Sequence, residues 1–105
     1  MILTINIAEE FSVTPGARYR TDGDFSGQEF FEEILGEKFL SVIDADNTLI
    51  VNLDGTDGYA TSFLDEAFGG LARKYGKDLV FSKVNFISEE EPYLIEEIKS
   101  YMNDE

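Results

Sequence analysis

The stretch that decides the fold runs from Thr48 to Tyr75 and reads TLIVNLDGTDGYATSFLDEAFGGLARKY. Its beginning, residues 48–53, is a nearly continuous apolar run, which is typical of a strand covered on both faces. A glycine-rich loop follows, and from Ser62 apolar residues recur in steps of three and four. This spacing predicts an amphipathic helix over residues 62–75. A buried strand, a loop and a helix in this order indicate an α/β domain.

Before this stretch, the sequence predicts a strand and a weak hairpin. Residues 3–7 alternate between apolar and polar side chains, the period of a strand with one buried face. Pro15 and Gly16 form a turn signal, so residues 17–21 are expected to return as a short edge strand.

Three more elements complete the pattern. Ser26 and Glu29 fit a capping box, which predicts a helix over residues 26–44. Apolar residues over 79–86 predict another strand, and the acidic, proline-containing opening of residues 88–102 predicts a last helix. We therefore expect a mixed, mostly parallel sheet of about four strands with three helices.

The composition supports one domain and argues against several classes of partner. The chain has 105 residues, of which 43% are apolar, and this is enough for a single core over residues 1–105. A net charge of −14 makes direct binding to nucleic acid or to an anionic membrane unfavourable. The acidic surface is either only solvated or meets a basic partner, and the sequence leaves both open.

Cysteine and histidine are both absent from the sequence. The chain therefore has no disulfide, no thiol nucleophile and no imidazole base or ligand. We expect no enzyme activity, no cofactor and no metal. Because there is no signal peptide and no long apolar run, a cytoplasmic location is expected.

The helix over 62–75 carries the candidate interaction surface. A helical wheel built on its apolar stripe places two adjacent glycines outward, where they cost ~2 kcal/mol of helix stability. A close approach by a partner or by a second copy of the chain would explain them, and so would packing under a neighbouring loop. The candidate partner-binding residues on this face are Ser62, Glu66, Gly69, Gly70 and Arg73.

Several polar residues of this stretch and of the N-terminal third have local explanations. Asp54 and Asp57 lie beside glycines and are expected to form turns, rather than to ligate calcium. Ser62 and Asp65 fit a second capping box. Arg18 and Arg20 are expected either to pair with nearby carboxylates or to contact an anion.

Three segments resemble a bacterial and phage family of STAS-like domains of unknown function. They are Gly58-Tyr-Ala-Thr-Ser-Phe-Leu-Asp-Glu-Ala-Phe-Gly-Gly-Leu71, Gly23-Asp-Phe-Ser-Gly-Gln-Glu-Phe30 and Phe86-Ile-Ser-Glu-Glu-Glu-Pro92. STAS domains proper include anti-anti-sigma factors, in which a Ser or Thr at the start of the helix after a central strand is phosphorylated by a partner kinase. The resemblance implies Thr61 as the matching position, with Ser62 as the alternative.

The sequence is consistent with two functions from different classes. The first is a non-enzymatic regulatory or adaptor module that binds another protein, such as a kinase- or ATPase-type regulator, through helix 62–75 and its preceding loop. The second is a small acidic phage-type inhibitor that mimics nucleic acid and occupies the groove of a basic enzyme. Thr61 and Ser62 are the candidate phosphorylation sites in the first case.

Overall fold

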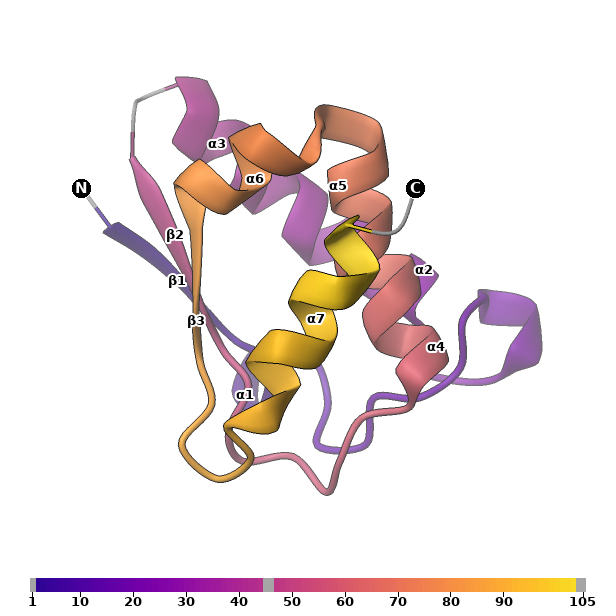
Figure 1. The fold of residues 1–105 in the computed structure, drawn as a ribbon. Coiled ribbons are helices and arrows are strands. Elements are labelled where there is room, and N and C mark those ends of the chain that lie inside the picture. The colour runs from indigo at the N-terminus through magenta and orange to yellow at the C-terminus, as the bar shows by residue number, and fades with distance from the viewer. Residues whose placement is uncertain (1, 45–46, 104–105) are drawn as a thin grey trace.

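The computed structural model describes residues 2–44 and 47–103, which fold into a parallel sheet with helices packed on one face (Figure 1). Over these residues the sheet has three strands in the order β1-β2-β3. The elements are β1 (Ile2–Asn6), α1 (Ile7–Glu10), η1 (Arg20–Asp22), α2 (Gly27–Phe30), η2 (Phe31–Leu35), α3 (Gly36–Asp44), β2 (Thr48–Asn52), α4 (Thr61–Leu64), η3 (Asp65–Gly69), α5 (Gly70–Tyr75), α6 (Lys77–Lys83), β3 (Val84–Ile87) and α7 (Tyr93–Asn103).

The strand order explains why the helices share one side. Each connection moves one strand further in the same direction, and parallel crossovers are right-handed, so both connecting segments fall on the same face. The register places Ile5 beside Val51 and Val51 beside Phe86. These side chains point toward the helices, and Ile5 and Val51 are fully buried.

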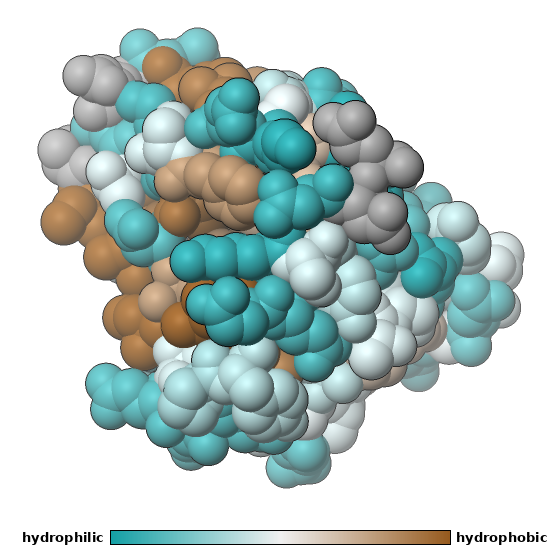
Figure 2. Space-filling view, viewed as in Figure 1, coloured by the Kyte–Doolittle hydropathy of each residue, from teal (hydrophilic) through white to brown (hydrophobic). Residues whose placement is uncertain are grey.

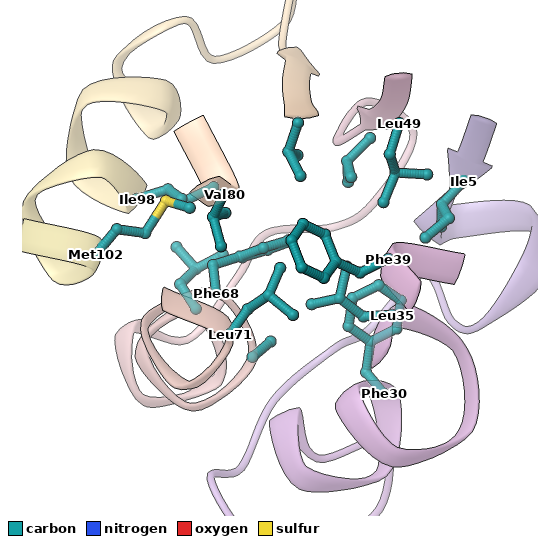
Figure 3. Packing of buried hydrophobic residues seen from close by; sticks show 14 of the residues in the cluster. Ile5, Phe30, Leu35, Phe39, Leu49, Phe68, Leu71, Val80, Ile98 and Met102 are labelled. Atoms are coloured by element: carbon teal, nitrogen blue, oxygen red, sulfur yellow. The ribbon is translucent and has the colours of Figure 1, made fainter. Parts of the chain in front are cut away.

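The core fills the space between the sheet and the helical layer (Figure 3). Four phenylalanines are fully buried in it, and Phe30 lies 5.7 Å from Phe63 and 6.1 Å from Phe68 between ring centroids. These aromatic contacts join α2, which carries Phe30, to α4 and η3, which carry Phe63 and Phe68. The two helices therefore pack against each other as well as against the sheet.

Each of the two long crossover helices contains a π-helical turn. The first helix is continuous from α2 through η2 to α3, and the second from α4 through η3 to α5. The two π-helical turns, η2 and η3, lie against each other in the fold. Such turns are rare in proteins overall, but those that occur are often found at functional sites. The apolar periodicity of the sequence did not indicate them.

Most predicted elements are confirmed, but three predictions are wrong. The described part of residues 15–25 contains no strand: residues 20–22 form a short 3₁₀ turn instead of an edge strand. Residues 77–83 are helical, so the strand expected over 79–86 is confined to 84–87. The sheet accordingly has three strands rather than about four, and within the described residues all pairs are parallel.

The helical conformation before β3 has a local cause. Gly76 adopts φ 94°, a left-handed conformation that glycine tolerates, and this lets α6 begin directly after α5. Val80 and Val84 then both point into the core, four residues apart. Apolar residues at this spacing fit a helical turn as well as a strand.

None of the described helices is long and apolar enough to cross a membrane.

Candidate interaction site

The helix at the centre of the candidate site begins at Thr61, one residue earlier than predicted. Ala60 is its N-cap and contributes no side-chain hydrogen bond, so the predicted Ser62–Asp65 capping box is wrong. Thr61 is exposed and Ser62 is partly exposed. Both hydroxyls therefore lie at an accessible helix N-terminus, whose backbone N–H groups favour an anionic group.

The loop before this helix is held by reciprocal bonds to the loop after β3. The Asp54 carboxylate accepts hydrogen bonds from the backbone N–H groups of Glu89 at 3.1 Å and Glu90 at 3.0 Å. In return, the Glu90 carboxylate accepts one from the Gly55 N–H at 2.8 Å. Asp54 therefore joins the carboxyl ends of two neighbouring strands, a larger role than the isolated turn predicted for it.

Tyr59 fixes the other end of this loop. Its hydroxyl donates to the Leu53 carbonyl oxygen at 2.8 Å, and its ring lies 5.9 Å from that of Phe63. Burial raises the pKa of Tyr59 to about 12, because the phenolate would lose hydration in this position. The loop is therefore a fixed surface between strand and helix.

Asp65 is the electrostatic centre of the site. Its carboxylate accepts a hydrogen bond from Arg18 at 2.8 Å and another from Arg73 at 3.2 Å, while Arg73 also donates to the Asp65 carbonyl at 3.2 Å. Partial burial alone would raise the pKa of Asp65, but the hydrogen bonds from both arginines outweigh it and hold this pKa below its usual range. Arg18 also lies 3.6 Å from Glu66, so it ties the N-terminal segment to the helix.

Both arginines proposed as anion contacts are paired with carboxylates. Arg20 lies 2.8 Å from Glu33 and 3.3 Å from Glu32, and both glutamates belong to η2. Arg18 pairs with Asp65 and Glu66 on the other helix. Pairing with carboxylates, one of the two alternatives open from sequence, is the arrangement in the structure.

The two glycines differ, although the helical wheel treats them alike. Gly69 is buried, and a Cβ placed on it would lie 2.6 Å from the Asp65 carboxylate and 2.9 Å from an Arg73 nitrogen. The helical wheel is therefore wrong in placing Gly69 at the outer surface, because the ion pair of its own helix covers it. Gly70 is partly exposed, and a Cβ there would lie 3.8 Å from the Phe31 ring, an ordinary contact distance.

A groove of about 280 Å³ lies between the two long helices where their π turns meet. It is lined by Gln28, Phe31, Glu32, Glu66, Gly70 and Lys74. Lys74 lies 5.8 Å from the centre of the Phe31 ring. Two of the predicted partner-binding residues, Glu66 and Gly70, thus line one hollow, while Ser62, Gly69 and Arg73 are not among its lining residues.

The sequence reasoning missed one residue that shapes this groove. Gly27 is buried, and a Cβ on it would lie 2.7 Å from the Phe63 carbonyl oxygen and 2.9 Å from the Glu66 Cβ. The absence of a side chain lets the first helix approach the second this closely. Its position directly after the Ser26 N-cap was the only sequence signal.

Among residues 2–44 and 47–103, no three carboxylate side chains come together in a metal-binding arrangement.

Comparison with known proteins identifies a family but no closer relative. The family described as a STAS-like domain of unknown function matches residues 26–94, well over half of the chain. No curated protein and no solved structure matches. The match includes both long helices, β2, β3 and the loop before α4. The chain therefore belongs to the family of STAS-like domains of unknown function.

Proposed function

We propose that the protein is a non-enzymatic adaptor or regulatory module that binds another protein through the outer side of helix α4–η3–α5 and the loop before it. The observation that carries the proposal is the groove between the two π turns. It combines an aromatic wall, Phe31, with the carboxylates of Glu32 and Glu66. Lys74 already lies over the Phe31 ring, and Arg18 and Arg20 lie within 3.6 and 3.3 Å of Glu66 and Glu32. An apolar partner side chain packed on Phe31 and Gly70 therefore fits this lining better than a basic one.

Filling the groove tests this proposal. Gly70→Leu places a branched side chain against Phe31, and we expect partner binding to fall at least tenfold while the fold is retained. Gly69→Leu is unsuitable because it would break the ion pair between Asp65 and Arg73. Ser100→Leu is the matched control, since Ser100 is an exposed residue of α7 outside the groove.

The assay starts from capture of partners by the tagged protein, followed by dissociation constants measured with the purified partner. Loss of binding in Gly70→Leu but not in Ser100→Leu supports the groove. Equal binding by wild type and Gly70→Leu for every captured partner would show that the partner binds elsewhere.

Phosphorylation of Thr61, or of Ser62, would regulate this surface. A phosphate adds nearly two negative charges at the helix N-terminus, where they interact favourably with the helix dipole and alter the adjoining interface. The exposure of Thr61 and the absence of a side-chain cap support this step. Intact mass after incubation with a candidate kinase, compared for wild type, Thr61→Ala and Ser62→Ala, identifies the site. An unmodified mass with every candidate kinase would contradict phosphorylation.

A small acidic inhibitor is the second candidate function. It is favoured by the carboxylates that gather at one end of the molecule. Glu9, Glu10, Asp57, Glu89 and Glu90 all lie in segments that follow the strands, and these segments gather at one end (Figure 1). An inhibitor of this kind should compete with DNA or RNA for a basic enzyme and weaken steeply with salt. Salt-independent binding without such competition contradicts it.

A further inference from the structure

In the strands that the structure describes, the face of the sheet opposite the helices carries no charged side chain. Strand residues alternate between the two faces, and Ile5, Val51 and Val84 point into the core. The residues that point the other way in the described strands are Ile2, Thr4, Asn6, Thr48, Ile50, Asn52, Asn85 and Ile87. In a chain of which 29% is charged, a solvent-exposed surface of this size would ordinarily carry charge.

The apolar residues of this face lie on a diagonal across the three strands, one on each strand, with threonine or asparagine beside them. Ile2 is 62% exposed, and Ile50 and Ile87 are partly exposed without belonging to the described core. Figure 2 shows the apolar atoms along the side of the molecule where the strands lie. Parallel sheets almost always have both faces covered, because their strands bury side chains on each side. Here the described helices cover only one face.

The size of the face decides between occupants. Three strands of about five residues measure about 14 by 17 Å from strand spacing and rise, or about 240 Å². A stable dimer needs about 800 Å² from each partner, and two copies with a charge of −14 repel each other. A single α-helix, about 10 Å wide, matches the face.

The charge around the face specifies the helix further. Glu9 and Glu10 follow β1, and Glu89 and Glu90 follow β3, and all four are exposed. Asp54 follows β2 between them. The carboxyl ends of the strands are therefore bordered by acids, whereas the face itself is neutral. A complementary helix is apolar along one stripe and basic at the end that lies over this border.

We propose that the open face of the sheet binds an amphipathic helix of a partner protein, with its apolar stripe on Ile2, Ile50 and Ile87 and its Lys or Arg residues over the strands' carboxyl ends. This surface lies on the other side of the sheet from the groove between the long helices. It is independent of the proposed function, since a partner could occupy either surface while the other is free.

Isoleucine-methyl NMR of the full chain provides a direct test. The probe is a synthetic helix of about 15 residues, about 22 Å long, with a leucine stripe and lysines at one end. The matched peptide carries glutamates in place of the lysines. We expect the lysine peptide to shift the methyl signals of Ile2, Ile50 and Ile87, while those of Ile5 and Ile98 in the core stay in place.

Variants of the central strand connect the shifts to binding. Ile50→Lys should weaken the lysine peptide at least tenfold in fluorescence anisotropy, and Ile50→Thr, which keeps a β-branched side chain, should weaken it less. Leu40→Lys is the control, because Leu40 is 44% exposed on α3 and outside this face. Circular dichroism verifies that each variant folds.

Three results would overturn the proposal. The first is unchanged Ile2, Ile50 and Ile87 signals at millimolar lysine peptide, and the second is equal binding of the lysine and glutamate peptides. The third is a shift of the same signals on raising protein concentration without peptide, which would identify a second copy as the occupant. Selective shifts with the lysine peptide, lost in Ile50→Lys and kept in Leu40→Lys, support it.

Discussion

Replacing Gly27 by alanine should destabilise the protein, although glycine is an unfavourable helix residue. Alanine would gain up to ~1 kcal/mol from its higher helix propensity. Its Cβ, however, would lie 2.7 Å from the Phe63 carbonyl oxygen and 2.9 Å from the Glu66 Cβ. Neither atom is at the end of a flexible side chain, so the two helices must move apart. Overpacking of this kind costs about 1–3 kcal/mol.

Because only a shift of the backbone could relieve the clash, we take the upper end of this range, about 3 kcal/mol. Subtracting the gain of ~1 kcal/mol in helix propensity leaves a net loss of about 2 kcal/mol for Gly27→Ala. This corresponds to a fall of roughly 8–16 °C in the melting temperature. In urea, monitored by circular dichroism, the midpoint should fall by about 1 M at an unchanged slope.

Gly70→Ala is the matched comparison. Its Cβ would lie 3.8 Å from the Phe31 ring, so the same substitution introduces no clash. Gly70→Ala should therefore stabilise the protein by up to ~1 kcal/mol through helix propensity. A Gly27→Ala protein as stable as wild type would show that the close approach of the two helices is not a packing constraint, and the reasoning would fail.

Three further predictions concern polar contacts. Asp65→Asn should cost about 1 kcal/mol at pH 7, because both arginines lose their shared carboxylate. Since the pKa of Asp65 is lowered by folding, this stabilisation is present above the unfolded pKa near ~4 and lost at lower pH, so urea midpoints of variant and wild type should converge there. Tyr59→Phe should remove a loss of stability between pH 10 and about 12, where only the unfolded tyrosine is ionised; melting temperatures against pH measure it. Asp54→Ala should cost about 1–2 kcal/mol and speed hydrogen exchange at the Glu89 and Glu90 amides, which lose their acceptor. Urea midpoints of Asp65→Asn and wild type that stay apart at low pH would contradict the first prediction. The same fall in melting temperature above pH 10 in Tyr59→Phe would contradict the second, and unchanged exchange at the two amides in Asp54→Ala would contradict the third.

Local patterns were sufficient to predict most of the fold. The alternation in residues 3–7, the apolar run in 48–53 and the steps of three and four in 62–75 each depend on which side chains face the core. The element before β3 could not be assigned this way. Leu79, Val80 and Phe81 favour a strand by composition, but the left-handed Gly76 and the packing of Val80 place them in a helix.

The candidate site was harder to predict because its contacts join distant residues. Ser62 and Asp65 have the spacing of a capping box, yet Asp65 bonds Arg18, which lies 47 positions away in the sequence. The helix begins at Thr61, so Ser62 is not its N-cap, and the Asp65 carboxylate accepts charge-assisted bonds from Arg18 and Arg73 instead. Sequence spacing alone contains no information about such a partner.

The π turn explains why a helical wheel misplaced Gly69. In a regular α-helix, residues eight apart are separated by about 80° around the axis, so Asp65 and Arg73 would not meet. A turn closed by an i→i+5 bond holds one more residue, which brings these two side chains to the same face. They then lie directly over Gly69, whose missing Cβ leaves room for the pair. The glycine is therefore required by the ion pair of its own helix, and the surface that we propose for a partner lies beside it, at Gly70 and Phe31.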